Sequence, residues 1–91
     1  MSASRMNLAL VGTYWTYSPE KDQENPLVLV KVRSIGRKED DVVMRCRIWM
    51  REGLLPQQIE VIQGQFNPFD PTTLEDFLEM ADSGILQSFG G

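Results

Sequence analysis

The alternation of apolar and polar positions divides most of the chain into segments typical of β-strands. Residues 8–17 are rich in apolar and aromatic side chains, which predicts a first strand with Gly12 as a candidate bulge. Residues 27–35 and 42–50 alternate clearly and contain several β-branched side chains, so we expect two further strands. The turn-like residues 36–41 lie between them, which predicts an antiparallel hairpin. Residues 58–66 contain two isoleucines and a valine and suggest a shorter fourth strand.

A helical pattern begins after the two prolines within residues 67–71. Thr72 and Glu75 have the separation of a capping box, in which each side chain bonds to the backbone N–H of the other residue. We therefore expect a helix to start at Thr72 or Thr73. Four apolar residues then recur along one helical face: Leu74, Phe77, Leu78 and Ala81. Gly84 is a natural end for this helix, because glycine readily adopts the left-handed conformation found there.

These elements predict a mainly β protein of the α+β class. We expect a small antiparallel sheet of about four strands, or an open SH3-like barrel, capped by one C-terminal helix, because a lone sheet of this size needs a second layer. A length of 91 residues suits one domain. We place this globular domain at residues 8–86, between a flexible N-terminus over residues 1–7 and a flexible C-terminal tail over residues 87–91.

Composition agrees with a folded protein and narrows its chemistry. The apolar share of 42% and the charged share of 24% are ordinary for globular proteins. The absence of histidine removes Ser-His-Asp catalysis and imidazole metal ligation. The single cysteine, Cys46, rules out an internal disulfide, which favours a reducing, cytoplasmic location. The apolar run over residues 8–11 is too short for a signal peptide or a membrane span, so we expect no membrane association.

Charge is distributed unevenly along the chain. Residues 1–51 hold all nine Lys and Arg residues against six acids, a net charge of +3. Residues 52–91 hold seven acids and no base, so their net charge is −7. Such an asymmetry between two halves of a chain indicates separate charged surfaces for a partner.

The third strand of the sheet divides into two faces by alternation. One set of side chains should point inward: Val42, Met44, Cys46, Ile48 and Met50. The other set should point outward: Val43, Arg45, Arg47, Trp49 and Arg51. Lys31 and Arg33 on the second strand can lie beside the outward set. We therefore expect a basic sheet face that also carries an aromatic side chain.

This basic face has two functional interpretations. Arginine forks with a stacking tryptophan are the combination that single-strand nucleic-acid binders use. Arginines also commonly solvate the open face of an antiparallel sheet, where they can contact a protein partner. We favour the second interpretation because the whole chain is acidic, with a net charge of −4.

The acidic residues of the predicted helix, chiefly Glu75, Asp76 and Glu79, form a second candidate binding surface. They can dock a basic partner or simply keep the helix soluble. They can also pack near the positive sheet edge of the same or a neighbouring chain, which would favour a homo-oligomer.

No pattern in the sequence identifies a catalytic group, a cofactor or a metal site. Carboxylates are the only plentiful reactive side chains, but Asp40 and Asp41 lie in a turn and the helix acids face solvent, so neither set is desolvated. Calcium-binding and phosphate-cradling loop motifs are missing from the sequence. Cys46 alternates with apolar residues, which indicates a buried small hydrophobe. The aromatic residues could form a cage for a methylated ammonium, although most are needed for the core.

We therefore expect a non-catalytic protein-binding module, such as an inhibitor, adaptor or assembly subunit. The alternative is a domain that binds RNA or single-stranded DNA through Lys31, Arg33, Arg45, Arg47, Trp49 and Arg51. An enzyme that uses carboxylates alone is a third and less favoured alternative.

Overall fold

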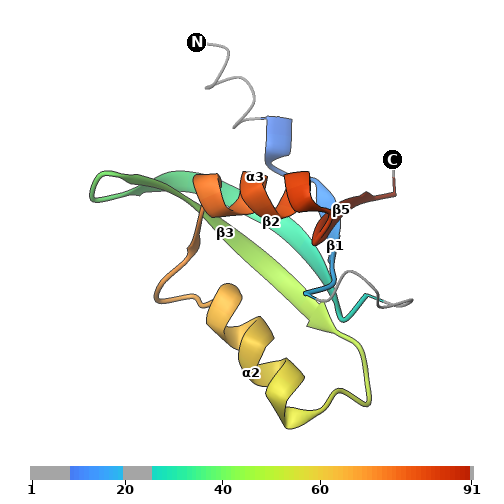
Figure 1. Cartoon of the computed structure of the whole chain (residues 1–91). Coiled ribbons are helices and arrows are strands. Elements are labelled where there is room, and N and C mark those ends of the chain that lie inside the picture. The colour runs from blue at the N-terminus through green and yellow to red at the C-terminus, as the bar shows by residue number, and fades with distance from the viewer. Residues whose placement is uncertain (1–8, 20–25, 91) are drawn as a thin grey trace.

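The computed structural model describes residues 9–19 and 26–90 (Figure 1). They form five strands and two ten-residue helices. In chain order these are β1 (Tyr14–Tyr17), β2 (Val28–Lys38), β3 (Asp41–Met50), α2 (Pro56–Gln65), β4 (Thr72–Thr73), α3 (Leu74–Ser83) and β5 (Leu86–Phe89). The expected class, a mainly β protein of the α+β class, is confirmed, although about four strands and one helix were expected.

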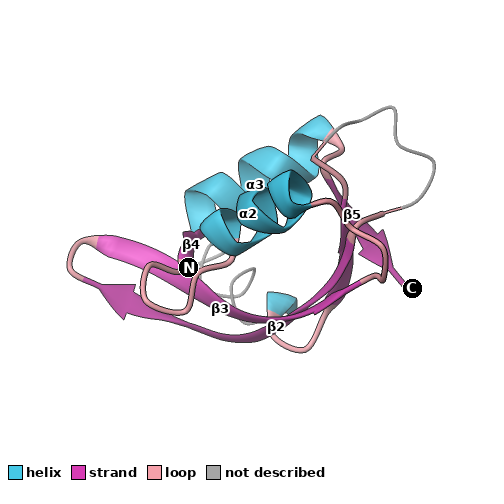
Figure 2. Ribbon diagram, turned by 90° about the horizontal axis from the view of Figure 1, so that it is seen from below, coloured by secondary structure: helices cyan, strands magenta, loops and turns pink. Residues whose placement is uncertain are grey.

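The strands build one curled antiparallel sheet in the order β4-β3-β2-β1-β5. Both helices lie on its concave side, as Figure 2 shows. The sheet thus resembles half of a barrel, with the helices filling the open side. Neither α2 nor α3 lies on the convex side.

The β2–β3 hairpin is the longest pairing and confirms the predicted hairpin. Its register runs from Val28 opposite Met50 to Lys38 opposite Asp41, so only two residues form the turn. The strands therefore extend into the segment that we expected to be a loop. A bulge between Val32 and Ser34 leaves Arg33 without a direct partner in the ladder.

The core lies between the sheet and α3. Phe77 is fully buried and packs in a T-shaped arrangement with the Trp15 ring, with ring centroids 5.2 Å apart. Val30, Val32 and Met44 line the sheet side of the same cluster. This packing gives the sheet the second layer that its size requires.

The ends of α3 agree with the sequence pattern, but the capping residue differs from the predicted pair. The Thr73 hydroxyl accepts a hydrogen bond of 3.1 Å from the backbone N–H of Asp76, and Gly84 ends the helix in the left-handed conformation. Thr72 is buried, and its hydroxyl instead donates to the carbonyl oxygen of Gln65. The capping box predicted between Thr72 and Glu75 is therefore wrong.

The predicted fourth strand over residues 58–66 is also wrong, because this segment forms α2. Pro56 occupies the first helical turn, where its missing N–H costs nothing. The side chain of Gln58 accepts a hydrogen bond of 2.8 Å from the backbone N–H of Leu55. Ile62 and Phe66, four positions apart, are the buried residues through which this segment joins the core. The β-branched residues that suggested a strand fit a helix anchored at these two points.

Both chain ends also differ from the prediction. The tail expected over residues 87–91 includes most of β5, which pairs with β1 from Tyr14 opposite Phe89 to Tyr17 opposite Leu86. The predicted strand over residues 8–17 is shorter, because β1 starts only at Tyr14. Gly12 adopts a turn conformation with φ of 88° and donates to the carbonyl oxygen of Val32. Residues 1–8, and with them the predicted flexible N-terminus, lie outside the described residues.

Within the described ranges, no helix has the length and apolar character needed to cross a lipid bilayer.

Candidate functional site

The register of the sheet gathers aromatic and basic residues on its convex face. Directly opposite residues share a face, so the pairings set one row across β5, β1, β2 and β3. That row is Phe89, Tyr14, Lys31 and Arg47. The neighbouring row places Leu29 opposite Trp49. Two strands outside the hairpin, β1 and β5, thus contribute to the surface predicted for the hairpin alone.

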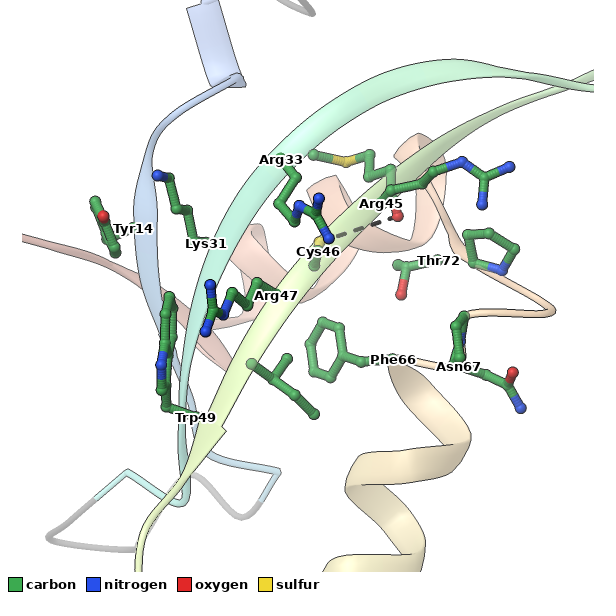
Figure 3. Close-up of a pocket in the computed structure, with 14 residues that line it drawn as sticks. Tyr14, Lys31, Arg33, Arg45, Cys46, Arg47, Trp49, Phe66, Asn67 and Thr72 are labelled. Carbon is green, nitrogen blue, oxygen red and sulfur yellow. Dashed lines mark hydrogen bonds between the residues drawn. The ribbon is translucent and has the colours of Figure 1, made fainter.

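The predicted basic residues are brought together with one exception. Lys31, Arg33, Arg45 and Arg47 surround the outer side of β3, with Tyr14 and Trp49 beside them (Figure 3). We call these six residues the basic–aromatic face. Arg51 lies just beyond β3 and lines a separate, smaller groove of about 260 Å³ that shares only Trp49 with the first.

Two cations of the basic–aromatic face rest on aromatic rings. The Lys31 ammonium lies 5.4 Å from the centre of the Tyr14 ring, and the Arg47 guanidinium lies 5.0 Å from the Trp49 ring. The two rings are themselves stacked at an angle of 27°, with centroids 6.4 Å apart. Each such contact stabilises an exposed pair by roughly 0.5–1 kcal/mol, which restricts the side chains before any ligand arrives.

A groove runs along the free side of β3 between the basic–aromatic face and the segment that connects α2 to β4. Its volume is about 730 Å³. Figure 3 shows Arg47 and Trp49 on one side of β3 and Phe66, Asn67 and Thr72 on the other. Its remaining lining residues are Met44, Cys46, Ile48, Pro68 and Pro71. One wall is therefore charged and the other is mainly apolar.

The groove has a strong and uncompensated positive charge. Its described lining residues include four cations and no carboxylate. The single ion pair formed within the described ranges joins Lys38 to Asp70 at 3.9 Å and includes none of these cations. An anionic ligand would therefore meet basic side chains that are not already neutralised.

The acidic residues proposed as a second surface lie elsewhere. Glu75, Asp76 and Glu79 are exposed on α3, which covers the concave side of the sheet (Figure 2). The basic–aromatic face lies on the convex side and along the edge of β3. The structure thus keeps the two signs of charge on opposite sides of the sheet and does not join them into one site.

The predicted division of β3 into two faces holds only in its central part. Arg45, Arg47 and Trp49 are exposed as expected. Val43 was expected on the outer face, but it is buried where β4 pairs alongside β3. Met50 was expected to face inward, but 39% of its surface is exposed because it ends the strand.

The aromatic residues do not form one cage. Trp15 packs against Phe77, and the Tyr17 and Phe66 rings form a T-shaped pair with centroids 5.0 Å apart, so these rings belong to the core. Tyr14 and Trp49 lie on the convex face. Phe69 is 87% exposed in the loop before β4.

Cys46 faces the groove but has the properties of a packing residue. Its side chain is half-buried, and burial raises the pKa of the thiol from 9.0 to about 11. A thiol with so high a pKa is a poor nucleophile near neutral pH. In the part of the chain that the structure describes, no three Cys, Asp or Glu side chains gather as a group that could hold a metal ion.

The apolar wall was not predicted from the sequence. Phe66, Asn67, Pro71 and Thr72 come from a segment beyond the hairpin, and the first of them was placed in a strand. The one indication in the sequence was Pro56, a residue typical of a first helical turn, which indicates the start of the helix that leads into this segment.

Comparison with protein-family models, with curated proteins and with solved structures found no match to this chain. The function is therefore inferred from the residues of the groove alone.

Proposed function

We propose that this protein is a non-catalytic protein-binding module that takes an acidic segment of its partner in the groove beside β3. The observation that carries this proposal is the set of groove residues, which include four cations without a neutralising carboxylate among the described positions. Roles as an inhibitor, an adaptor or an assembly subunit all fit this mode of action.

The side chains of the basic–aromatic face support a protein partner. Arg, Trp and Tyr are the residue types that most often dominate the binding energy of protein interfaces. Here Arg47 is already held against Trp49, so less rotamer freedom is lost on binding. An apolar wall beside these residues adds surface that a peptide side chain can bury.

Binding of single-stranded nucleic acid is supported less well. Such binders use open aromatic faces on which bases stack. Tyr14 and Trp49 each already have a cation and the other ring as neighbours. A base would have to displace one of these contacts.

The proposal is tested by titrating the protein with an acidic peptide and measuring heat by calorimetry. The probe is a capped seven-residue peptide of alternating glutamate and valine, and a single-stranded oligothymidylate serves as the competing ligand. We expect the peptide to bind and Arg47→Glu to weaken binding by at least about 10-fold, because a charge attraction becomes a repulsion.

Arg37→Glu is the matched control, because Arg37 is an exposed arginine of the same hairpin that does not line the groove. It makes the same change in net charge. An equal loss of affinity in both variants would mean that only the overall charge matters and would overturn the proposed site. Tight binding of the oligothymidylate without binding of the peptide would favour the nucleic-acid alternative.

A further inference from the structure

One edge of the sheet is left open along half of β3. β2 pairs with β3 over its whole length, but on the other side β4 pairs only with Val43 and Met44. From residue 45 to residue 50 no described strand lies along this side. The open edge is one wall of the groove.

The hydrogen bonds of the hairpin show which backbone groups point toward this edge. The N–H of Arg51 donates to the carbonyl oxygen of Leu27, so the backbone of residue 51 points toward β2. Since the backbone N–H and C=O groups of successive residues in a strand point to opposite sides, those of residues 49 and 47 also point toward β2. The N–H and C=O groups of Cys46 and Ile48 therefore point into the groove, and those of Met50 point to the same side of β3. An added strand could pair with these groups.

The two sides of this edge differ in chemistry. On the convex side, Arg45, Arg47 and Trp49 flank the edge. On the concave side, Cys46 and Ile48 are half-buried above the nearly buried Phe66. A strand laid along this edge would place alternate side chains against these two environments.

We propose that the open edge of β3 binds an extended acidic segment of a partner protein as an additional strand. Acidic side chains of this segment lie beside Arg45 and Arg47, and the alternate, apolar side chains lie over Ile48 and Phe66. This inference rests on the proposed function and adds the mode of recognition, in which backbone pairing supplies affinity and alternate side chains supply specificity.

The dimensions of the groove fit this occupant. Residues 46–50 offer an edge of about 17 Å, which pairs with about five extended residues. β4 already occupies the same position beside β3 at Val43 and Met44, and it runs antiparallel. The bound segment continues that line and is expected to have the same orientation.

A second copy of this chain is a poorer occupant of this edge. If the β3 edges of two copies paired with each other, the arginines of one copy would lie next to the arginines of the other. Like charges placed across neighbouring strands are destabilising. Charge complementarity therefore favours an acidic partner.

The experiment uses the alternating glutamate–valine peptide with three matched forms. One form has the same composition with the glutamates and valines in separate blocks. The other two carry N-methyl groups either on the valines or on the glutamates. In an antiparallel pairing, the residue directly opposite Ile48 has its side chain on the same face as Ile48, and its backbone groups point toward β3. The valines lie on that face, so their N–H groups point toward β3. Valine methylation should then lower the affinity by about 10-fold or more, whereas glutamate methylation should have a smaller effect.

Amide hydrogen exchange of the protein provides the second readout. The peptide should slow exchange at Cys46, Ile48 and Met50 by about 10-fold or more, because these amides gain acceptors. The amide of Trp49 already pairs with β2 and should change little.

The outcomes separate this inference from the proposed function. Selective loss in one methylated form, with slower exchange at Ile48, supports strand addition, and the sensitive form reports the orientation. Equal binding of all four peptides with unchanged exchange at Ile48, while Arg47→Glu still weakens binding, overturns strand addition and leaves the proposed function standing. Failure of every peptide to bind at millimolar concentration overturns both. Concentration-dependent dimerisation that slows the same amides without peptide would show that a second copy occupies the edge.

Discussion

At the scale of single residues, Cys46 shows how position changes reactivity. It lies within the groove, yet burial raises the pKa of its thiol to about 11. Burial is the cause of this rise, so the residue acts as part of the apolar wall.

We predict slow alkylation of Cys46 by iodoacetamide at pH 8. A rise in pKa from 9.0 to about 11 lowers the thiolate fraction by about 100-fold, so the folded protein should react about 100-fold more slowly than the urea-unfolded protein. Mass spectrometry of timed samples measures the rate. Similar rates for the two states would contradict the assigned burial.

The same pKa difference makes stability depend on pH. Between pH 9 and pH 11 the unfolded chain loses the thiol proton first, so the free energy of unfolding should fall as pH rises. Burial also raises the pKa of Tyr17, which contributes to the same trend. Comparison with Cys46→Ala isolates the thiol, because this variant should lose less stability over that interval.

At the scale of the secondary-structure elements, local patterns predicted the hairpin and α3 but not α2 or β5. The hairpin strands alternate over many residues, and α3 has both an apolar stripe and clear terminal residues. In contrast, β5 has only four residues with one buried, Leu86, and it becomes a strand by pairing with β1. Pairing between such distant segments leaves no local pattern to detect.

The candidate site was predictable to a similar extent. Alternation within β3 correctly grouped Arg45, Arg47 and Trp49. The contribution of Tyr14 depends on β1 pairing beside β2, and the apolar wall depends on where α2 returns to the sheet. Both are properties of tertiary structure that alternation within one strand does not contain.

The start of α3 allows a direct test of one capping bond. Thr73→Ala removes the acceptor for the N–H of Asp76 and should lower the free energy of unfolding by about 1 kcal/mol, within a range of roughly 0.5–2 kcal/mol. Urea denaturation measures the change. Thr73→Ser keeps the hydroxyl and should stay close to the unchanged protein; an equal loss in both variants would argue against the cap.

At the scale of the whole molecule, the acidic helix and the basic–aromatic face lie on opposite sides of the sheet. The core and the acidic helix α3 occupy the concave side, while the basic–aromatic face occupies the convex side and the free edge of β3 (Figures 2 and 3). Substitutions of the basic–aromatic face should therefore leave the core intact.

Two phenylalanines provide a matched test of where the core lies. Phe77 is fully buried between α3 and the sheet, so Phe77→Ala should lower the free energy of unfolding by roughly 3–5 kcal/mol. Phe69 is 87% exposed, and Phe69→Ala should change it by less than about 0.5 kcal/mol. Urea denaturation of both variants gives the comparison. A large loss for Phe69→Ala would show that this ring packs against the fold.

The two-residue turn between β2 and β3 has a consequence for folding kinetics. Residues joined by so short a loop meet early, because loop closure costs the least entropy there. The pairing of β1 with β5 joins positions such as Thr16 and Gln87 and must wait for a much larger loop to close. We therefore expect Lys31 and Arg47 to become neighbours early in folding. The charged wall of the groove should then form before β1 pairs with β5.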